Sequence, residues 1–404
     1  MSWEKMKLND VCISISDGDH QPPPKANKGV PFVTISNITY TNQFDFSNTM
    51  FVPQEYYDGL DSKRKAQEGD VLYSVVGSFG IPVYIKNNTP FVFQRHIAIL
   101  RPNVYKIAPQ FLYYTMLNRD FYLKADAAAI GAAQRTVSLT ALRNMEIEIP
   151  HIETQKKIAK ILSSYDNLID NNQKQIKLLE EAAQRLYKEW FVDLRFPGYE
   201  DVKIVDGVPE GWRKGRADSF FNITIGKTPP RAEKQWFVKG DAGVPWLSIS
   251  DMGNARIYAF ATSEALTQEA IKKHNMKIVP SGTIFVSFKL TVGRVSIAAT
   301  DMCTNEAIAH FYIENDLQQA YTFCYLNNFK YDSLGNTSSI SKAVNSKIIK
   351  AMPFVMPDKA TILAFSKLVV PILNEIKNKQ ATCIKLAEAR DRLLPKLMCG
   401  EIEV

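Results

Sequence analysis

Apolar and polar residues follow two different periods along the chain, and the change of period marks its parts. In residues 1–151, short apolar runs such as 71–76 and 91–93 lie between Gly, Pro and Asn, which is typical of strands joined by turns. One helix is predicted in this part, from Pro109 to Lys124. Residues 154–190 contain neither Gly nor Pro, and their apolar positions recur every three or four residues, which predicts one long helix.

The same order, a mixed module and then a long helix, occurs again in the second half. Residue stretches repeat with it: 29–36 returns as 243–250, 69–74 as 282–287, and 93–98 as 304–309. Two large modules that are similar but diverged suggest two similar tasks with different targets. The sequence therefore predicts an α+β fold with a first module at 1–151, a helix and linker at 152–198, a second module at 199–357 and a second helix at 358–404.

Both predicted helices carry a seam of apolar residues with coiled-coil spacing, so we expect them to pair with each other in antiparallel fashion. Polar Asn172 and Lys379 occupy equivalent seam positions, 207 residues apart, where a polar residue commonly fixes the register. Pro371 is expected to kink or restart the second helix. The predicted seam contains Ile158, Leu162, Ile169, Asn172, Ile176, Leu179 and Leu186 in the first helix, and Val369, Ile372, Ile376, Lys379, Leu386 and Leu393 in the second.

Composition adds a moderate basic excess, with a net charge of +7, which favours a polyanionic partner without proving one. The five cysteines are scattered and have no metal-ligand spacing, which argues against a zinc site and suits a reducing compartment. We find no apolar run long enough for a membrane helix and no signal peptide, so a cytoplasmic location is expected.

Catalytic motifs are missing where they would be expected. Gly226-Lys227-Thr228 resembles the end of a phosphate-binding loop, but the required first glycine is replaced by Phe221. No Gly-rich dinucleotide motif is present, and the five histidines form no ligand pair. The sequence thus indicates a binding protein without catalytic residues or a bound metal.

Three segments resemble one known family, the specificity subunits of type I restriction–modification systems. Residues 150–162 resemble the P-x-x-E-Q-x-x-I-A-x-x-L start of the family's conserved helix, with Thr154 as a one-residue departure. Residues 186–198 resemble the end of that helix, and Pro209-Glu210-Gly211-Trp212 resembles the opening of the family's second target-recognition domain. The resemblance extends over essentially the full length.

The resemblance implies that each module is a target-recognition domain that reads one half of a split double-stranded DNA site. The helices would space the modules and dock two modification (methyltransferase) subunits. Those partners would supply S-adenosylmethionine and the adenine methylation chemistry, and restriction subunits that use ATP and Mg²⁺ could join. This chain itself would need no cofactor. A protein-binding scaffold with two modules and a self-sufficient enzyme remain the alternatives.

Candidate DNA-contacting residues are those at which the repeat keeps its glycines and changes its side chains, together with nearby basic and polar residues. Each could also be an ordinary turn or surface residue. The charged faces of the first helix could be either a solvated exterior or a docking surface. The candidates are Lys25, Ser74, Gly77, Ser78, Gln94, Arg95 and Arg135 in the first module, and Lys227, Arg231, Lys289, Thr291, Arg294, Asn305 and Lys342 in the second.

Overall fold

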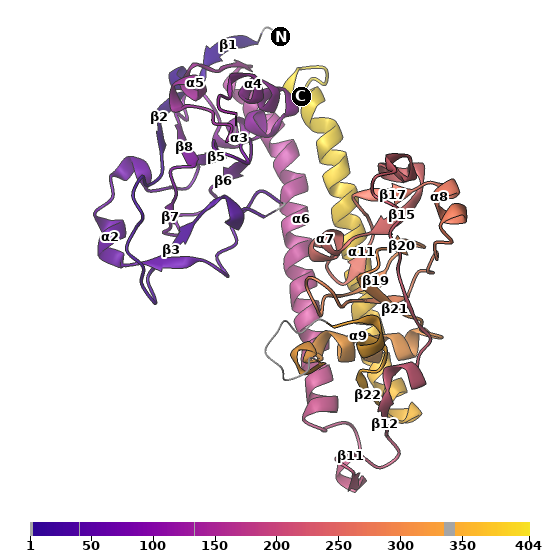
Figure 1. The fold of residues 1–404 in the computed structure, drawn as a ribbon. Coiled ribbons are helices and arrows are strands. Elements are labelled where there is room, and N and C mark those ends of the chain that lie inside the picture. Colours follow the sequence, from indigo (N-terminus) through magenta and orange to yellow (C-terminus); the bar gives the residue numbers. More distant parts are fainter. Residues whose placement is uncertain (1–2, 40, 133, 335–343) are drawn as a thin grey trace. The chain divides into compact units, whose positions relative to one another are not determined.

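The chain folds into two compact units in the computed structural model, which describes residues 3–39, 41–132, 134–334 and 344–404 (Figure 1). Unit 1 comprises Met1–Ile169 and Lys385–Val404, and unit 2 comprises Asp170–Ile384. Each unit therefore contains one mixed module and parts of both long helices. Among the described residues, no helix is long and apolar enough to cross a membrane.

The module of unit 1 is built on two small sheets. One has four strands in the order β2-β8-β5-β6, and the other has three in the order β4-β3-β7. A separate antiparallel ladder joins β1 to β9, so the start of the module is held to its end. The strands are β1 Glu4–Lys7, β2 Cys12–Asp17, β3 Val30–Val33, β4 Met50–Val52, β5 Val71–Ser74, β6 Pro82–Tyr84, β7 Val92–Phe93, β8 Ile97–Pro102 and β9 Glu146–Ile149.

The module of unit 2 repeats this plan with small additions. Its sheets have the orders β13-β21-β18-β19-β16 and β14-β17-β15-β20, and the ladder β12-β22 corresponds to β1-β9. A further two-stranded hairpin, β10-β11, precedes the module. The strands are β10 Ile204–Val205, β11 Val208–Pro209, β12 Arg213–Arg216, β13 Ile223–Ile225, β14 Phe237–Val238, β15 Val244–Leu247, β16 Tyr258–Ala259, β17 Glu264–Leu266, β18 Ile284–Ser287, β19 Val295–Ala298, β20 Cys303–Thr304, β21 Ile308–Phe311 and β22 Pro353–Met356.

Short helices connect the strands, and two long helices follow the modules. The helix predicted from Pro109 to Lys124 is in fact two helices, α3 and α4, because Asn118 adopts an extended conformation between them. The helices are α1 Leu8–Val11, α2 Gln54–Asp58, α3 Pro109–Leu117, α4 Arg119–Ala128, α5 Leu139–Asn144, α6 Ile152–Tyr187, α7 Ile249–Asn254, α8 Gln268–Lys273, α9 Asp316–Asn328, α10 Ser346–Lys350 and α11 Lys359–Met398.

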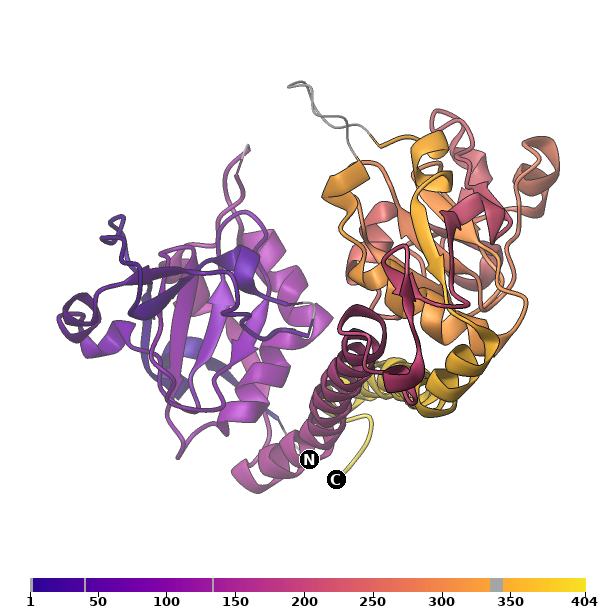
Figure 2. The same ribbon diagram turned by 90° about the horizontal axis from the view of Figure 1, so that it is seen from below.

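In unit 1 the first half of α6 packs antiparallel to the last turns of α11. Ile158 and Leu162 share one buried cluster with Leu397, and Asp166, further along α6, bonds to Arg390, which lies earlier in α11. Helix α3 lies between the strands of the first module and α6 (Figure 2), and its Phe111 and Leu112 share a buried cluster with Ile158 and Leu162. Buried Gln155 fastens this contact, since its side chain accepts the Ala108 N–H at 2.9 Å and donates to the Lys106 and Pro150 carbonyls.

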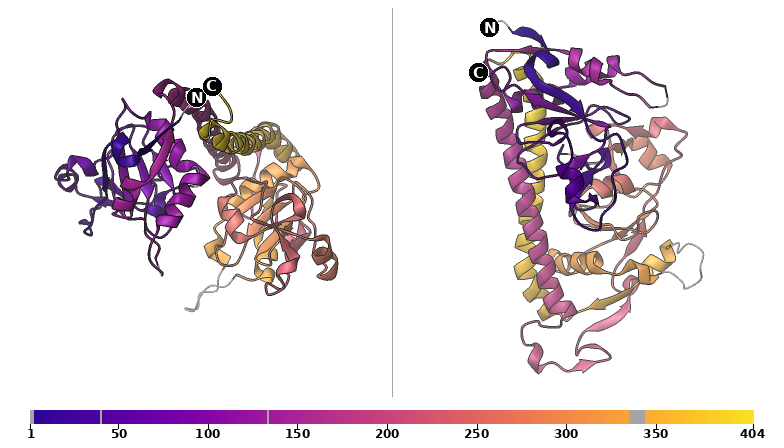
Figure 3. Two further views of the ribbon diagram at one scale, coloured as in Figure 1. Left: turned by 90° about the horizontal axis from the view of Figure 1, so that it is seen from above. Right: turned by 90° about the vertical axis from the view of Figure 1, so that its left-hand side faces the viewer.

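In unit 2 the second half of α6 packs in the same antiparallel sense against the first part of α11. The rings of Trp190 and Phe365 lie 5.7 Å apart, and Ala183 shares a buried cluster with Leu373. Helix α9 lies against both helices (Figure 3), and its Tyr321 ring contacts Tyr187 of α6. The predicted α+β fold, with two similar modules and two long packed helices, is confirmed.

The predicted seam residues differ in their burial. Asn172 and Lys379 are half-buried, and Lys379 reaches Glu375 on its own helix at 3.0 Å. The fully buried positions are Ile158, Leu162, Ile169, Ile176, Val369 and Ile376, and the half-buried ones also include Leu179, Leu186, Ile372, Leu386 and Leu393.

The expected restart of the second helix at Pro371 is wrong. Helix α11 continues through this residue as one helix of 40 residues. A proline in a helix interior leaves the carbonyl four positions earlier without its N–H partner. Here Pro371 and Lys367 both lie on the exposed side of α11, where water can bond that carbonyl.

Candidate nucleic-acid interface

Four loops of unit 1 follow the ends of four strands, and backbone hydrogen bonds join them to one another. They are residues 18–21 after β2, 34–37 after β3, 75–80 after β5 and 94–96 after β7. The Asp19 N–H donates to the Phe93 carbonyl at 2.9 Å, the Gln94 N–H to Val33 at 3.2 Å, and the Val75 N–H to His96 at 2.8 Å. We call this set of four loops the loop edge of the module.

The loop edge of unit 2 has the same backbone frame. Its segments are residues 226–231 after β13, Ser248 with the short helix α7 after β15, 288–293 after β18 and 305–307 after β20. The corresponding hydrogen bonds run from Lys227 N–H to the Thr304 carbonyl at 3.0 Å, from Asn305 to Leu247 at 3.0 Å, and from Phe288 to Ala307 at 2.9 Å. The repeat seen in the sequence is therefore a repeat of hydrogen bonds between loops.

A serine closes the longest loop of each edge. The Ser74 hydroxyl accepts the Ile81 N–H at 2.9 Å, and the Ser287 hydroxyl accepts the Arg294 N–H at 3.0 Å, seven residues on in both cases. Ser74 and Ser287 are fully buried. Ser74, predicted to contact DNA, is thus occupied in holding the loop, and its hydroxyl is not accessible to a ligand.

The glycine that ends this loop is required by both its conformation and its surroundings. Gly80 and Gly293 have φ of +94° and +90°, a region that L side chains rarely adopt. A Cβ atom at Gly293 would lie 2.7 Å from the Tyr331 ring, and one at Gly80 would lie 2.5 Å from the Tyr122 ring. The glycine–tyrosine contact fixes the course of the loop in both modules.

Five candidates of the first module present exposed or half-exposed groups at or near the loop edge. Gly77 and Ser78 are exposed at the tip of loop 75–80, and Arg95 is exposed beside half-buried Gln94. Lys25 is also exposed, seven residues beyond Gly18 in the segment that follows β2. These groups are polar or basic, as contacts to bases and phosphates require.

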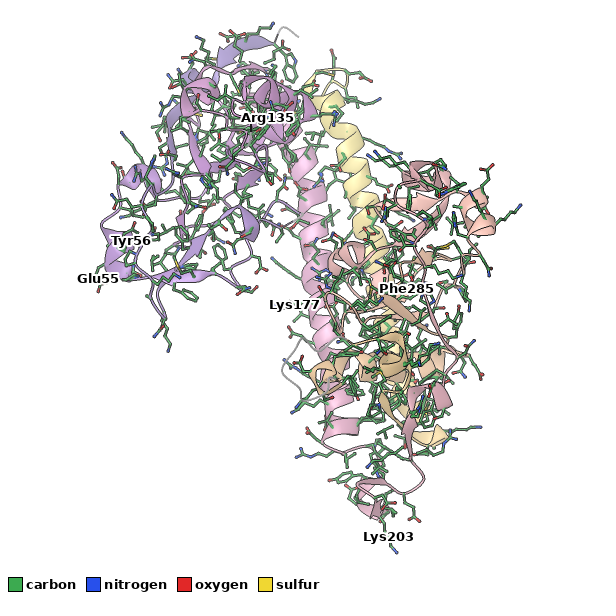
Figure 4. The ribbon with its side chains drawn as sticks, in the orientation of Figure 1. Glu55, Tyr56, Arg135, Lys177, Lys203 and Phe285 are labelled. Atoms are coloured by element: carbon green, nitrogen blue, oxygen red, sulfur yellow. The ribbon has the colours of Figure 1, made fainter. Side chains whose placement is uncertain are left out.

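Arg135, in contrast, is already engaged within unit 1. Its guanidinium donates to the carboxylate and the carbonyl of Asp126, and it lies 5.6 Å from the centre of the Phe79 ring. The Gly77 N–H donates to the Arg135 carbonyl at 3.0 Å, so the segment of Arg135 supports loop 75–80 (Figure 4). Its side chain is 44% exposed, so the guanidinium can reach a phosphate although it is already bonded to Asp126.

In the second module, Lys289 and Thr291 are exposed on loop 288–293, and Asn305 is half-buried in the next loop. The Asn305 carboxamide oxygen accepts the Ala307 N–H at 3.1 Å. Lys227 is exposed and donates to the Asn275 carbonyl at 3.3 Å. Lys342 lies outside the described residues.

Two arginines of the second module have structural partners. Arg231 bonds to Glu264 at 2.7 Å and stacks on Phe237 and Trp246, with its guanidinium 4.3 and 4.5 Å from the ring centres. Arg294 donates to the Ile249 carbonyl at 2.7 Å, which ties loop 288–293 to α7. Both arginines therefore bond to other parts of the second module and help to hold its loops in place.

The two loop edges carry opposite charges at two equivalent positions. Asp19 and Arg95 in the first module correspond to Lys227 and Glu306 in the second, because each pair follows the same frame residues. The hydroxyl of Tyr56 donates to Asp19, and that of Thr228 donates to Glu306. Buried Asp19 and exposed Glu306 are not among the predicted contact residues, although an alignment of the two repeats through Phe93 and Thr304 places Glu306 opposite Arg95.

A buried histidine supports the second loop edge. His310 is fully buried, with its Nδ1 2.9 Å from the Thr224 hydroxyl and its Nε2 2.6 Å from the Thr304 hydroxyl, and its ring contacts Phe285 in the module core (Figure 4). Burial, together with Lys277, lowers the pKa of His310 to about 3. The ring therefore stays neutral near pH 7 and holds β13 and β20 together beneath Asn305.

The incomplete phosphate-loop motif gains no support from the fold. Lys227 and Thr228 follow β13 in an extended loop, whereas a phosphate cradle needs a glycine-rich turn that leads into a helix N-terminus. Among the described residues, no group of three or more His, Cys, Asp or Glu side chains could hold a metal ion.

Two similar mixed modules and two long packed helices define the fold, and sequence comparison shows the family. Residues 1–181 and 209–382 match the family described as the type I restriction modification DNA specificity domain. The chain belongs to this family. It is a specificity subunit of a type I restriction–modification system, which determines the DNA target and is itself non-catalytic.

Relatives agree over nearly the whole length. The chain is 25% identical to the type I restriction enzyme HindI specificity subunit of Haemophilus influenzae, over 99% of both chains. It is 27% identical to the putative type I restriction enzyme MjaX specificity subunit of Methanocaldococcus jannaschii, over 100% of this chain and 94% of the relative. The crystal structure of the type I S subunit from M. genitalium has the same fold, with a TM-score of 0.58 at 14% identity over 98% and 96% of the two chains.

Proposed function

We propose that this specificity subunit reads a bipartite double-stranded DNA site, with one half-site contacted by the loop edge of each module. We assign the target-recognition domains to residues 1–151 and 199–357 and the spacer helices to 152–198 and 358–404. Two adenine methyltransferase (modification) subunits dock on the helices. The protein-binding scaffold remains the alternative that the experiments below address.

The observation that carries this proposal is the repeated loop frame with changed side chains. Backbone groups make the hydrogen bonds between the loops, so the frame persists while Asp19 and Arg95 are exchanged for Lys227 and Glu306. Bases are distinguished by donors and acceptors presented to the groove edges, and a change of charge reverses what a position can recognise. The two loop edges share one backbone frame but carry opposite charges at equivalent positions. They are therefore suited to two different half-sites.

Exposed basic residues at both edges suit the approach of a phosphate backbone. Arg95 and Lys25 are exposed in the first module, and Lys289 is exposed in the second. Affinity for DNA comes largely from such contacts, and it falls as salt rises because they release counterions. The net charge of +7 acts in the same direction.

A fixed spacing between the half-sites is consistent with the uninterrupted long helices. Helix α6 contains 36 residues, one half in each unit, and neither Gly nor Pro interrupts it. At a rise of ~1.5 Å per residue, a helix of this length spans about 54 Å. At ~3.4 Å per base pair this distance corresponds to at most about 16 base pairs between module centres.

Docking of the modification subunits is supported by apolar side chains that the helices leave exposed. In α6, Leu168 is 51% and Leu178 is 65% exposed, and in α11, Leu363 and Leu368 are exposed to a similar degree. Lys156, Lys157, Lys160 and Lys177 lie exposed on α6 as well. Exposed apolar residues among charges are typical of surfaces that bind another protein.

The cofactors of the reaction then belong to the partners. S-adenosylmethionine is expected in the modification subunits, and ATP with Mg²⁺ in restriction subunits where these join. In this chain, Lys227 and Thr228 lack the glycine turn that a nucleotide phosphate needs.

Random-sequence DNA selection with the assembled methyltransferase tests the proposal, and methylome mapping in a host that carries this chain gives the same information in the cell. We expect two short half-sites separated by a constant number of unspecified base pairs. A single contiguous motif would refute the bipartite mechanism. Lack of any salt-dependent DNA affinity in the assembled complex would favour the protein-binding scaffold instead.

A pair of variants tests the assignment of one loop edge to one half-site. Arg95→Ala should relax sequence preference or affinity at one half-site only, and Asn305→Ala at the other only. Lys214→Ala is a suitable control, because this exposed lysine lies on β12 and belongs to none of the loops of either loop edge. An effect of Arg95→Ala and Asn305→Ala on the same half-site would contradict the assignment.

A further inference from the structure

Leu290 is the most unusual exposed residue of the second loop edge. Its side chain is 91% exposed, and its backbone has a φ of +63°. Four other described residues that are not glycine also have a positive φ. Three of them are Asn42, Asp206 and Asn275, and Asn and Asp tolerate this conformation better than other residues. The fourth is Leu194, which packs against the core. Among the residues that the structure describes, only Leu290 combines an unfavourable backbone conformation with an almost fully exposed aliphatic side chain.

The repeat shows that the frame does not need a leucine at this position. Gly77 occupies the equivalent place in loop 75–80, with a φ of +70°. Glycine adopts this conformation without strain, so the first module holds the same loop at a lower conformational cost. A residue that is strained and exposed, where its counterpart is glycine, indicates a function of the side chain itself.

The loop presents Leu290 rigidly. Ser287 clamps both ends, since its hydroxyl donates to the Thr291 carbonyl at 2.5 Å and accepts the Arg294 N–H at 3.0 Å. Phe288 is buried at the base of the loop, and Gly293 packs on the Tyr331 ring. A loop backbone held in this way loses little conformational entropy when a ligand covers the loop.

The neighbours of Leu290 define the surface that it can meet. Lys289 and Thr291, on either side, are both exposed and can hydrogen-bond. An aliphatic group between two polar groups matches the major-groove edge of an A·T pair, where the thymine methyl group lies next to hydrogen-bond acceptors and donors. A leucine in the centre of this loop can cover that methyl group while its neighbours contact adjacent polar atoms.

We infer that Leu290 is a specificity-determining residue that reads the 5-methyl group of a thymine in the half-site of the second module. This inference rests on the proposed function. It requires that one half-site contains at least one thymine whose methyl group is recognised, and that Leu290 acts on that half-site alone. Gly77 gives the first module no equivalent apolar contact.

Leu290→Gly is the informative variant, because it installs the residue that the other module already carries. It removes the strained conformation, so we expect thermal unfolding at the same or a higher temperature. In the complete complex with its modification subunits, affinity for the selected DNA should fall about tenfold. Ile204→Gly serves as a matched control, because Ile204 is 57% exposed on the β10–β11 hairpin outside the loop edge.

Deoxyuridine, which lacks only the methyl group, identifies the contact. Each thymine of the selected site is replaced in turn, and binding of the wild-type and Leu290→Gly complexes is compared. For one thymine, the wild-type complex should lose about fourfold in affinity, the factor expected from one buried methyl group, and the variant should lose nothing further.

Several results would overturn the inference: unchanged affinity of Leu290→Gly, a half-site pair without thymine, or equal losses from deoxyuridine in wild type and variant. An affinity loss in Leu290→Gly without any deoxyuridine effect would indicate stacking between bases and would also refute the methyl contact. Failure of the wild-type complex to bind DNA sequence-specifically would instead refute the proposed function. The two failures are therefore distinguishable.

Discussion

Arg390 and Asp166 form the most informative polar contact of the helix pair in unit 1. The Arg390 guanidinium lies 2.6 Å from one Asp166 carboxylate oxygen, and the Tyr114 hydroxyl donates to the other at 2.5 Å. The two charged side chains are only 18% and 19% exposed. At the repeat-equivalent positions in unit 2, 207 residues away, Ala183 and Leu373 form a buried apolar contact instead.

The repeat itself thus suggests the perturbation. Arg390→Leu leaves the largely buried Asp166 carboxylate without its cation, and we expect a loss of about 3 kcal/mol, the lower end for breaking a buried pair, because Tyr114 still bonds to it. Asp166→Ala should cost about 2 kcal/mol, since Arg390 keeps its contact with Asp391 at 2.7 Å. Independent effects would sum to about 5 kcal/mol.

The double variant imitates the apolar contact of unit 2 and should cost only about 2 kcal/mol, most of it from the unpaired Tyr114 hydroxyl. The coupling between the two positions is then about 3 kcal/mol. Hydrogen exchange of backbone amides in residues 158–166 and 388–397 measures the local free energy of opening, and amides of the unit 2 module serve as internal control. Additive losses of about 5 kcal/mol in the double variant would refute the view that the pair is a coupled contact with an apolar equivalent.

Three further changes test other parts of the fold and the site. Burial lowers the pKa of His310 to about 3, so below pH 6.5 the unfolded chain binds a proton that the native ring does not. The free energy of unfolding of unit 2 should therefore fall by about 2 kcal/mol from pH 7.5 to pH 5. Urea denaturation of His310→Gln should lack this part of the pH dependence. Gly293→Ala forces a Cβ against Tyr331 and should cost about 3 kcal/mol in thermal unfolding, compared with about 1 kcal/mol for Gly240→Ala, which has a positive φ but no neighbour within 4 Å. Arg95→Ala should weaken DNA binding and lower the slope of log affinity against log salt by about 1, and an unchanged slope would show that Arg95 meets no phosphate.

The sequence was sufficient to predict the architecture because its signals are long and repeated. The seam of α6 extends over several heptads without Gly or Pro, and its second copy stands 207 residues away. Pro371 misled the prediction, since a local rule cannot show on which side of the helix the unpaired carbonyl lies. At Asn118 the opposite error occurs: one helix was predicted where the structure has two. Asn118 ends α3, but asparagine is not a strong helix breaker in the sequence.

The loop edge could be predicted only in outline. Equivalent glycines marked loops 75–80 and 288–293, but they could not show that Ser74 points inward. All four residues of β5 are buried, so no alternation of polar and apolar positions reveals which side chain faces out. Arg231 shows the same limit in three dimensions, since its partner Glu264 lies 33 residues away on strand β17.

Under the proposed function, the groups that stabilise the loop edge are separate from the groups that would read DNA. Backbone groups join the loops, and buried residues such as Ser287 and Tyr331 fix their course, so exposed positions can change without loss of the frame. Leu290 stands where the first module has Gly77. The second module therefore has an unfavourable backbone conformation at this position, together with an apolar side chain at the tip of the loop. We expect duplicated modules to differ in target at positions where one copy has an unstrained residue and the other has a strained one. Because both copies are in one chain, each serves as the reference for the other.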